Sequence, residues 1–385
     1  MIYALAFFFI NSTFVIINPY LQVVLSNLGY GFKAVGFFQA CFEGVGILGP
    51  LLLGYLANKT NRYKELTIFS LLASSVFFYS LSFDNSYLTV VFLLILTGFF
   101  FRAIAPLLDS ISNNAVKGDS SKYTLVRSAG TMGYVLISAA LSFFKRPLID
   151  SNQSIGFWLL VISFVSIVIM LFVPKGEIIE VPIPKSTSKE DNKWFNKGLV
   201  IGLIIMAMSR FSMAGIFSFL SLYSIQVVGY TDLTTLNLVA ALTEFFVMIY
   251  SGRLLQSKKV KSSNLLLFST FTVAIRLFMY AFLPGVKFLL LAQALHCFCY
   301  GSFHVSAIMF INEHVRIDKR GVGISLYYAL ATGLPMVLGS SIGGIIVSNF
   351  GFNTLFISYA FVSLVAVALG FVFYKPLRDN LMNRI

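Results

Sequence analysis

Apolar stretches of about 20 residues recur from one end of this chain to the other, which restricts it to a small set of folds. Of its 385 residues, 58% are hydrophobic and only 11% are charged. Soluble domains carry about 25% charged residues. In a bilayer, a helix satisfies all its backbone hydrogen bonds within one segment. The sequence therefore predicts an all-α membrane protein whose outer surface contacts the lipid bilayer.

The limits of the apolar stretches predict twelve transmembrane helices. They cover residues 2–27, 34–57, 65–82, 87–116, 122–144, 153–174, 198–228, 232–256, 263–283, 285–314, 318–348 and 351–374. The one long polar connection, over residues 175–197, contains Pro182 and Pro184 and divides the spans into six and six. We therefore expect an N-terminal six-helix bundle over residues 1–174, a cytoplasmic linker, and a C-terminal six-helix bundle over residues 198–385.

The basic residues of the loops indicate which side of the membrane each loop faces. One set of loops holds nineteen of them: Lys59, Arg62, Lys64, Lys117, Lys122, Lys175, Lys185, Lys189, Lys193, Lys197, Lys258, Lys259, Lys261, Arg316, Lys319, Arg320, Lys375, Arg378 and Arg384. The opposite set holds four: Lys33, Lys145, Arg146 and Lys287. Because cytoplasmic loops carry the excess of Lys and Arg, both termini and the linker are expected in the cytoplasm. The net charge of +13 therefore reflects orientation, and no nucleic-acid partner is expected.

The two predicted bundles resemble each other in the loop after their second span. A glycine is followed there by a basic turn, at Gly54, Lys59, Arg62 and Lys64 in the first bundle and at Gly252, Lys258 and Lys259 in the second. Two six-helix halves related by an axis along the membrane normal are the pattern of major facilitator transporters. The first turn also resembles the Gly-x-x-x-Asp-Arg/Lys-x-Gly-Arg-Arg/Lys signature of that superfamily, with Asn58 in place of the acid and Asn61 in place of the second glycine.

The chain resembles one subgroup of this superfamily along nearly its whole length. The run from Pro106 to Asp109, followed by the run from Tyr123 to Gly133 that includes Arg127, is similar to a Pro-Leu-x-Asp … Tyr-Gly-x-x-Arg-x-x-Gly-Ser-x-Gly pattern. That subgroup contains phenylpropionate-type permeases and is related to lactose-permease-like and nucleoside proton symporters. Further similar positions are Glu244, Arg276, residues 294–296 and 300–304, Gly339, Ser340, Gly343 and Gly344. The resemblance implies the major facilitator fold and transport of a small solute.

Charged residues inside the spans are the candidate site residues. An ionised side chain at mid-bilayer costs roughly 2.5–3.5 kcal/mol on insertion scales, so it is expected to face the bundle interior and to be paired. Asp109 and Arg127 flank a short turn, at depths that let their side chains meet between neighbouring helices. Arg102 lies seven residues before Asp109 and shares its helix face. The pair is either part of a substrate or proton site or a structural clamp between the two helices.

Glu244 lies near the middle of the eighth span and is the candidate proton-coupling residue. Burial favours the protonated form of a carboxyl group, and a residue that loads and unloads protons needs that property. The alternative is a permanent salt bridge to Arg276 on the next span. Glu43 is interpreted as the partner of a neighbouring arginine, and Arg210 as a contact of either the substrate or a carboxylate.

Polar residues on the tenth and first spans complete the candidates. His296, Tyr300 and His304 are spaced by four residues, so they lie along one stripe of a helix where they could relay protons or bind hydroxyl groups. A structural role for the buried histidines is the alternative, and their spacing does not suit a metal site. Asn18, which follows Asn11 on the same face, is either a substrate ligand or a contact between helices.

We interpret the chain as a secondary active transporter that moves a small polar or anionic solute by alternating access, with protons as the coupling ion. The deep charges are Arg102, Arg127, Arg210 and Arg276 against Glu43, Asp109 and Glu244. The spare cation suits a monoanion such as an aromatic acid, while sugars and nucleosides are alternatives. No Walker motif is found, so ATP-driven transport by this chain alone is not expected. We also expect no cofactor and no enzymatic activity.

Other functions compatible with the sequence are an efflux antiporter of the same superfamily, a polytopic membrane enzyme with catalytic histidines, and a sensor that transports nothing. Against an enzyme, no cytoplasmic loop carries a paired aspartate metal motif, and the two halves repeat. We expect a monomer in the plasma membrane, which is the inner membrane of a bacterium.

The predicted orientation can be tested by thiol labelling. In the Ser186→Cys variant, a membrane-impermeant maleimide should label the linker only when the cytoplasmic face is accessible. The Lys287→Cys variant, on the opposite side, should be labelled from outside. Labelling of Ser186→Cys from outside in intact cells would contradict the orientation.

Overall fold

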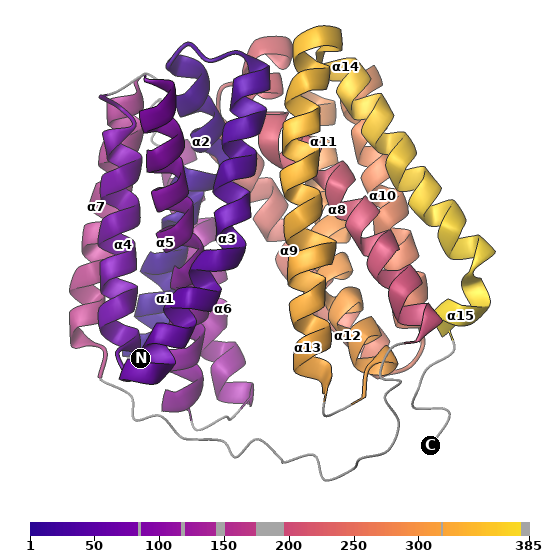
Figure 1. The fold of residues 1–385 in the computed structure, drawn as a ribbon, viewed down its shortest axis with the longest axis horizontal. Coiled ribbons are helices and arrows are strands. Elements are labelled where there is room, and N and C mark those ends of the chain that lie inside the picture. Colours follow the sequence, from indigo (N-terminus) through magenta and orange to yellow (C-terminus); the bar gives the residue numbers. More distant parts are fainter. Residues whose placement is uncertain (84–85, 117–119, 144–150, 175–195, 317–318, 379–385) are drawn as a thin grey trace. The chain divides into compact units, whose positions relative to one another are not determined.

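The computed structural model describes residues 1–83, 86–116, 120–143, 151–174, 196–316 and 319–378, and the regular structure of this part is entirely helical (Figure 1). The helices of the first half are α1 (Ile2–Ser12), α2 (Phe14–Asn27), α3 (Phe32–Thr60), α4 (Tyr63–Ser80), α5 (Tyr87–Ala115), α6 (Ser120–Phe143) and α7 (Asn152–Phe172). Those of the second half are α8 (Lys197–Tyr223), η1 (Ser224–Val228), α9 (Leu233–Gln256), α10 (Ser262–Phe282), α11 (Val286–Ala294), η2 (Cys297–Ser302), α12 (Phe303–His314), α13 (Arg320–Leu326), η4 (Tyr327–Gly333), α14 (Leu334–Val372) and α15 (Tyr374–Arg378). The segments η1, η2 and η4 are π-helical.

The predicted set of twelve spans is confirmed within these residues. Ten stretches are long and apolar enough to cross a membrane, and one of them, Val322–Val372, has 51 residues. A helix of that length would measure about 75 Å at 1.5 Å per residue, against a hydrocarbon core of about 30 Å. Gly351 divides the stretch in two, because its φ of 80° and ψ of 174° lie in a region open to glycine. The shorter helix α4, of 18 residues, completes the set.

The chain folds into two compact units. The first holds Met1–Val181 and Ser218–Leu238, and the second holds Pro182–Phe217 and Val239–Ile385. In the first unit α3 and α4 pack against α5, and α1 packs against α6 and α7. In the second unit α10 packs against α12, α14 and η2. The bundle limits expected from chain order, 1–174 and 198–385, stay a prediction, and all but the last two residues of the linker over 175–197 lie outside the described residues.

Glycines bring helix backbones together inside the first unit. A Cβ atom at Gly49 of α3 would lie 2.0 Å from the carbonyl oxygen of Phe99 on α5. A Cβ atom at Gly133 of α6 would lie 2.1 Å from the carbonyl oxygen of Phe8 on α1. These distances are far below van der Waals contact, so only glycine fits at the two crossings. Small residues at helix crossings let apolar helices gain packing energy that lipid cannot supply.

The turn between α3 and α4 explains one departure from the superfamily signature. Asn61, which stands where the signature has its second glycine, adopts φ 54° and ψ 34° at the end of α3. Asparagine tolerates this left-handed conformation better than other residues with a side chain. Lys64 then donates hydrogen bonds from Nζ to the carbonyl oxygens of Leu171 (2.7 Å) and Val173 (2.6 Å) at the end of α7. The basic turn therefore satisfies carbonyl groups that the last turn of α7 leaves open.

A polar cluster joins α6 to the start of α9 within the first unit. Ser142 donates from Oγ to Asp232 Oδ2 at 2.9 Å and lies 2.5 Å from Thr235 Oγ1. Asp232 also accepts from Thr235 N at 3.0 Å and from the Thr234 hydroxyl at 2.7 Å. Burial raises the pKa of Asp232, but these hydrogen bonds outweigh burial and leave the pKa below its usual value. The ionised carboxylate therefore stabilises the fold at neutral pH, and this contribution is lost as the pH falls through the folded-state pKa.

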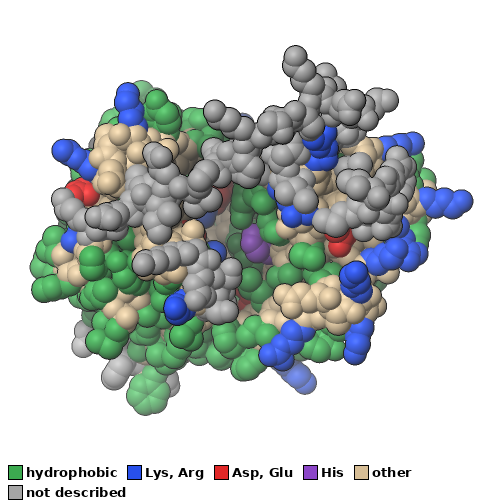
Figure 2. Space-filling view, turned by 90° about the horizontal axis from the view of Figure 1, so that it is seen from below, with side chains coloured by type: hydrophobic (Ala, Val, Ile, Leu, Met, Phe, Trp, Pro, Cys, Tyr) green, Lys and Arg blue, Asp and Glu red, His purple; other side chains and the backbone are tan. Residues whose placement is uncertain are grey.

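The surface of the helices is largely apolar. Large side chains such as Leu51, Phe172, Phe246 and Phe371 are more than half exposed, as expected for helices that face lipid. Figure 2 shows a face on which Lys and Arg side chains are widespread, with Asp and Glu at only a few places. Several of the basic residues counted from the sequence, including Lys117, Lys145, Arg146 and Arg384, lie outside the described residues. The helices identify an integral membrane protein, and the orientation of its termini stays a prediction.

The close approach of α3 and α5 predicts that two glycine-to-alanine substitutions on α3 differ in their effect on thermal stability. Gly49→Ala should lower the melting temperature in detergent, because overpacking typically costs about 1–3 kcal/mol. Gly54→Ala, on the same helix, meets nothing within 4 Å of the new Cβ, so it should leave stability unchanged or raise it. Equal melting temperatures for the two variants would contradict the crossing.

Candidate functional site

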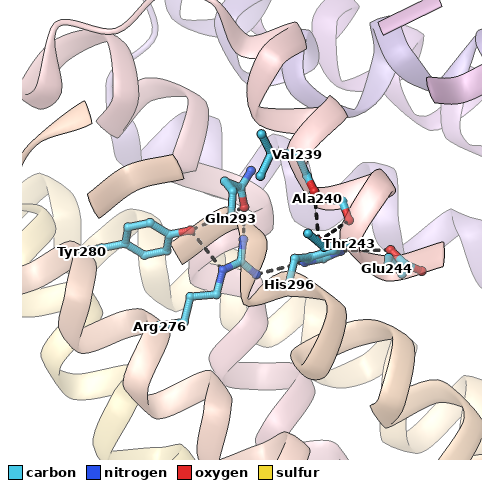
Figure 3. Close-up of polar contacts among 8 residues, drawn as sticks. All are labelled: Val239, Ala240, Thr243, Glu244, Arg276, Tyr280, Gln293 and His296. Carbon is cyan, nitrogen blue, oxygen red and sulfur yellow. Dashed lines mark hydrogen bonds and ion pairs between the residues drawn. The ribbon is translucent and has the colours of Figure 1, made fainter. Parts of the chain in front are cut away.

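Arg276 of α10 is the centre of a polar network inside the second unit (Figure 3). Its side chain is 1% exposed. Nε donates to the Tyr280 hydroxyl at 3.0 Å, Nη2 donates to Gln293 Oε1, and Nη1 lies 2.9 Å from His296 Nδ1. Tyr280 follows Arg276 by four residues on the same helix, and Gln293 precedes His296 by three. The spacing of each pair places both of its members on one helix face.

The contact between Arg276 and His296 decides where the imidazole carries its proton. A guanidinium group can only donate hydrogen bonds and does not deprotonate in proteins. Nδ1 of His296 must therefore accept, and the ring proton lies on Nε2. That nitrogen is 3.5 Å from Glu244 Oε2. While this contact persists, His296 is neutral and its N–H is directed at the carboxyl group of Glu244.

The local helix geometry brings Glu244 to this position. His296 immediately precedes the π-helical segment η2, and π-helical turns inside α-helices are frequent at functional sites. In η2, a Cβ atom at Gly301 would lie 3.1 Å from Glu244 Cγ. The glycine thus allows α9 to approach η2 closely enough for Glu244 to reach the imidazole. Cys297, at the start of η2, also interacts electrostatically with Glu244.

Aromatic rings connect this network to Arg210 on α8. The Tyr300 ring stacks on His296 with centroids 5.3 Å apart and an interplanar angle of 13°. The guanidinium carbon of Arg210 lies 4.7 Å from the centroid of the Tyr300 ring and 4.4 Å from that of Phe303. Arg210 is 3% exposed. The groups that surround Glu244 and His296 are thus two arginines, aromatic rings, a glutamine and the buried thiols of η2.

The first unit contains two other charged pairs. Glu43 of α3 contacts Arg102 of α5 through Oε1 and Nη2, and a Cβ atom at Gly46 would lie 2.8 Å from Arg102 Cγ. Arg127 Nη1 lies 3.9 Å from Asp109 Oδ2. The Tyr123 hydroxyl donates to Asp109 Oδ1 at 2.7 Å and accepts from Arg127 Nη1 at 3.3 Å. The structure therefore brings Asp109 and Arg127 together, with a tyrosine as the common partner.

The other sequence candidates have different surroundings. Glu244 and Arg276 form no direct ion pair in the described structure, because His296 lies between them. The His304 ring lies near the Tyr327 ring of η4, with ring centroids 6.4 Å apart. The imidazole that contacts Glu244 is that of His296. Asn18 is exposed. The sequence analysis did not identify Gln293 or Tyr280 as site residues. The available signal was helical spacing, since Gln293 lies three residues before His296 and Tyr280 four residues after Arg276.

The described network brings titratable groups together but does not group metal ligands. Among the described residues, no three His, Cys, Asp or Glu side chains are grouped so that they could hold a metal ion. Glu244 and His296 are the titratable groups in contact, and Arg276 supplies a fixed positive charge beyond the imidazole. Such an arrangement supports proton binding and release better than it supports nucleophilic chemistry.

Three comparisons with known proteins agree in the class of protein they return. The model of the "MFS_1 like family" matches residues 1–358. The chain is 21% identical to the probable 3-phenylpropionic acid transporter of Escherichia coli K12, over 97% of this chain and 96% of that protein. It is 22% identical to the putative nucleoside transporter YegT of the same organism, over 84% of this chain and 79% of that protein.

Solved structures with a similar fold are also transporters. The nucleoside transporter NupG matches with a TM-score of 0.80 and 15% identity, covering 97% of this chain and 98% of that chain. The xylose transporter XylE of E. coli in an inward-open conformation matches with a TM-score of 0.70 and 14% identity, covering 99% of this chain and 96% of that chain. At these identities the likeness concerns the fold.

Double-mutant cycles on thermal stability should distinguish the two charged pairs of the first unit. The coupling between Glu43 and Arg102 should exceed that between Asp109 and Arg127, because Arg127 is 59% exposed at its side chain and is 3.9 Å from its acid. Neutral variants (Glu43→Gln, Arg102→Gln, Asp109→Asn, Arg127→Gln) provide the cycles. Equal coupling in both would show that exposure does not weaken the Asp109–Arg127 pair.

Proposed function

The chain belongs to the MFS_1 like family of major facilitator transporters, and on this basis we propose that it takes up a small solute together with protons. Membership makes it a secondary transporter of a small molecule and not an enzyme. The coupling ion, the direction and the solute are the parts of the proposal that need experiments. The observation that carries the proposal is the contact between Glu244 and a neutral His296.

Glu244 is suited to hold the coupling proton because it is not neutralised by a direct cation. A nearby arginine favours the ionised form of a carboxyl group. Glu244 instead meets an imidazole N–H at 3.5 Å. Protonating it leaves no arginine without a partner, since Arg276 keeps its bonds to His296, Gln293 and Tyr280. The acid can therefore change its charge at small cost to the surrounding structure.

The class of solute is proposed from relatives and from charge. The two relatives from E. coli are named for a nucleoside and for 3-phenylpropionic acid, which both combine an aromatic ring with polar groups. Aromatic side chains close to the network, such as Tyr300, Phe303 and Phe217, suit a ring-containing solute. We therefore propose an aromatic acid or a nucleoside, with the acid favoured by the spare buried cation.

Replacing Glu244 by glutamine tests the proton role. Glu244→Gln imitates a carboxyl group that is always protonated, so it should bind solute and exchange it across the membrane yet fail to accumulate it. The measurement is uptake and counterflow in proteoliposomes with and without an inward proton gradient, over a panel of nucleosides, sugars and aromatic acids. Outward transport driven by the same gradient would indicate an antiporter.

Glu313→Gln is the matched control. Glu313 is also an acid near the network's helices, but it lies at the end of α12, where it accepts a hydrogen bond from Ser262 at 2.5 Å. It should accumulate solute as the parent does. Accumulation by Glu244→Gln equal to the parent would assign the proton role to another residue. Loss of all binding would make Glu244 a solute ligand.

A further inference from the structure

Arg210 differs from the other arginines inside the spans. It is 3% exposed, so it has lost nearly all of its hydration. In the described part of the chain no carboxylate lies within ion-pair distance of it, and its Nε has no hydrogen-bond partner. Tyr300 and Phe303 present ring faces to it, and the Tyr327 side chain interacts with it through a hydrogen bond as well as electrostatically.

These partners are weaker than those a buried guanidinium usually takes. A cation–π contact is weaker than the two parallel charge-assisted hydrogen bonds through which a guanidinium can bind a carboxylate. A permanent cation held by neutral aromatic residues is therefore suited to receive an anion from outside the protein.

The position of Arg210 relative to Glu244 gives such an anion a second effect. A continuous series of contacts runs from Arg210 to the Tyr300 ring, from that ring to His296, and from His296 to Glu244. Arg210 also interacts electrostatically with Glu244. A nearby cation favours the ionised form of a carboxyl group, and an anion bound to that cation cancels the effect.

We propose that Arg210 binds the carboxylate of the transported solute, and that this binding is what loads Glu244 with its proton. The inference rests on the proposed function and names the solute class within it, an organic monoanion with an apolar or aromatic body. The carboxylate replaces ring faces as the partner of the guanidinium. The field of Arg210 at Glu244 is then neutralised, and Glu244 takes up one proton from water.

The charges of this step balance. One carboxylate and one proton enter the site, so the loaded protein carries the same net charge as the empty one. Transport of the pair moves no net charge across the membrane. Accumulation should therefore respond to the pH gradient and not to the membrane potential, which acts only on net charge that is moved. A neutral solute carried with one proton would respond to both.

The first experiment compares probes that differ only in charge. Binding of cinnamate and cinnamamide, phenylacetate and phenylacetamide, and benzoate and benzamide is measured by calorimetry on the full chain in detergent. The parent should prefer the carboxylate of at least one pair. Arg210→Gln should reduce this carboxylate-to-amide affinity ratio roughly tenfold or more, and Arg210→Lys should retain part of it. The ratio does not depend on the fraction of protein that is folded, so a merely structural role for Arg210 would leave it unchanged.

The second experiment counts protons. Calorimetry in buffers of different ionisation enthalpy should show proton uptake when the parent binds the carboxylate, and none in Glu244→Gln. An unchanged affinity ratio in Arg210→Gln, or no preference for any carboxylate in the parent, would overturn the role of Arg210. If the parent then accumulates a neutral nucleoside with protons, the proposed function stands without this inference. If no solute in the panel responds to a proton gradient, the proposed function fails as well.

Discussion

A guanidinium group keeps its proton at any pH that a cell meets, so every arginine inside the spans must be solvated by the protein itself. The chain does this in different ways. Arg102 meets a carboxylate, Arg276 meets neutral polar groups, and Arg210 meets aromatic rings. Because the first of these neutralises the charge and the other two do not, the second unit keeps positive charge close to Glu244. The properties of the candidate site depend on this difference between the two units.

The neutral state of His296 follows from the same constraint. An imidazole near a carboxyl group would ordinarily gain a proton, but the Arg276 contact occupies Nδ1 as an acceptor. The imidazole therefore separates a permanent cation from a titratable acid without adding a charge of its own. Gln293 and Tyr280 accept hydrogen bonds from the Arg276 guanidinium and keep it in place. They therefore act on Glu244 only indirectly, through Arg276 and His296.

Much of the fold could be predicted from hydropathy, because bilayer thickness sets the length of each span and loop charge separates one span from the next. The meeting of Asp109 with Arg127 was also predictable, since the two flank one short turn. The partner of Arg276 could not be predicted. Whether that arginine meets Glu244 or His296 depends on the rotation of α10 against its neighbours and on the π-helical turn at η2, and neither can be read from residue spacing.

Two limits between the compact units fall inside helices, one between Phe217 and Ser218 of α8 and one between Leu238 and Val239 of α9, while the third, between Val181 and Pro182, lies outside the described residues. Domain movements in proteins usually hinge on loops or on the ends of elements. Because α8 and α9 each contribute residues to both units, the chain offers no loop at these two limits, and the backbone there is helical. A substitution that bends either helix at these points, such as a proline, would therefore alter residues of both units at once.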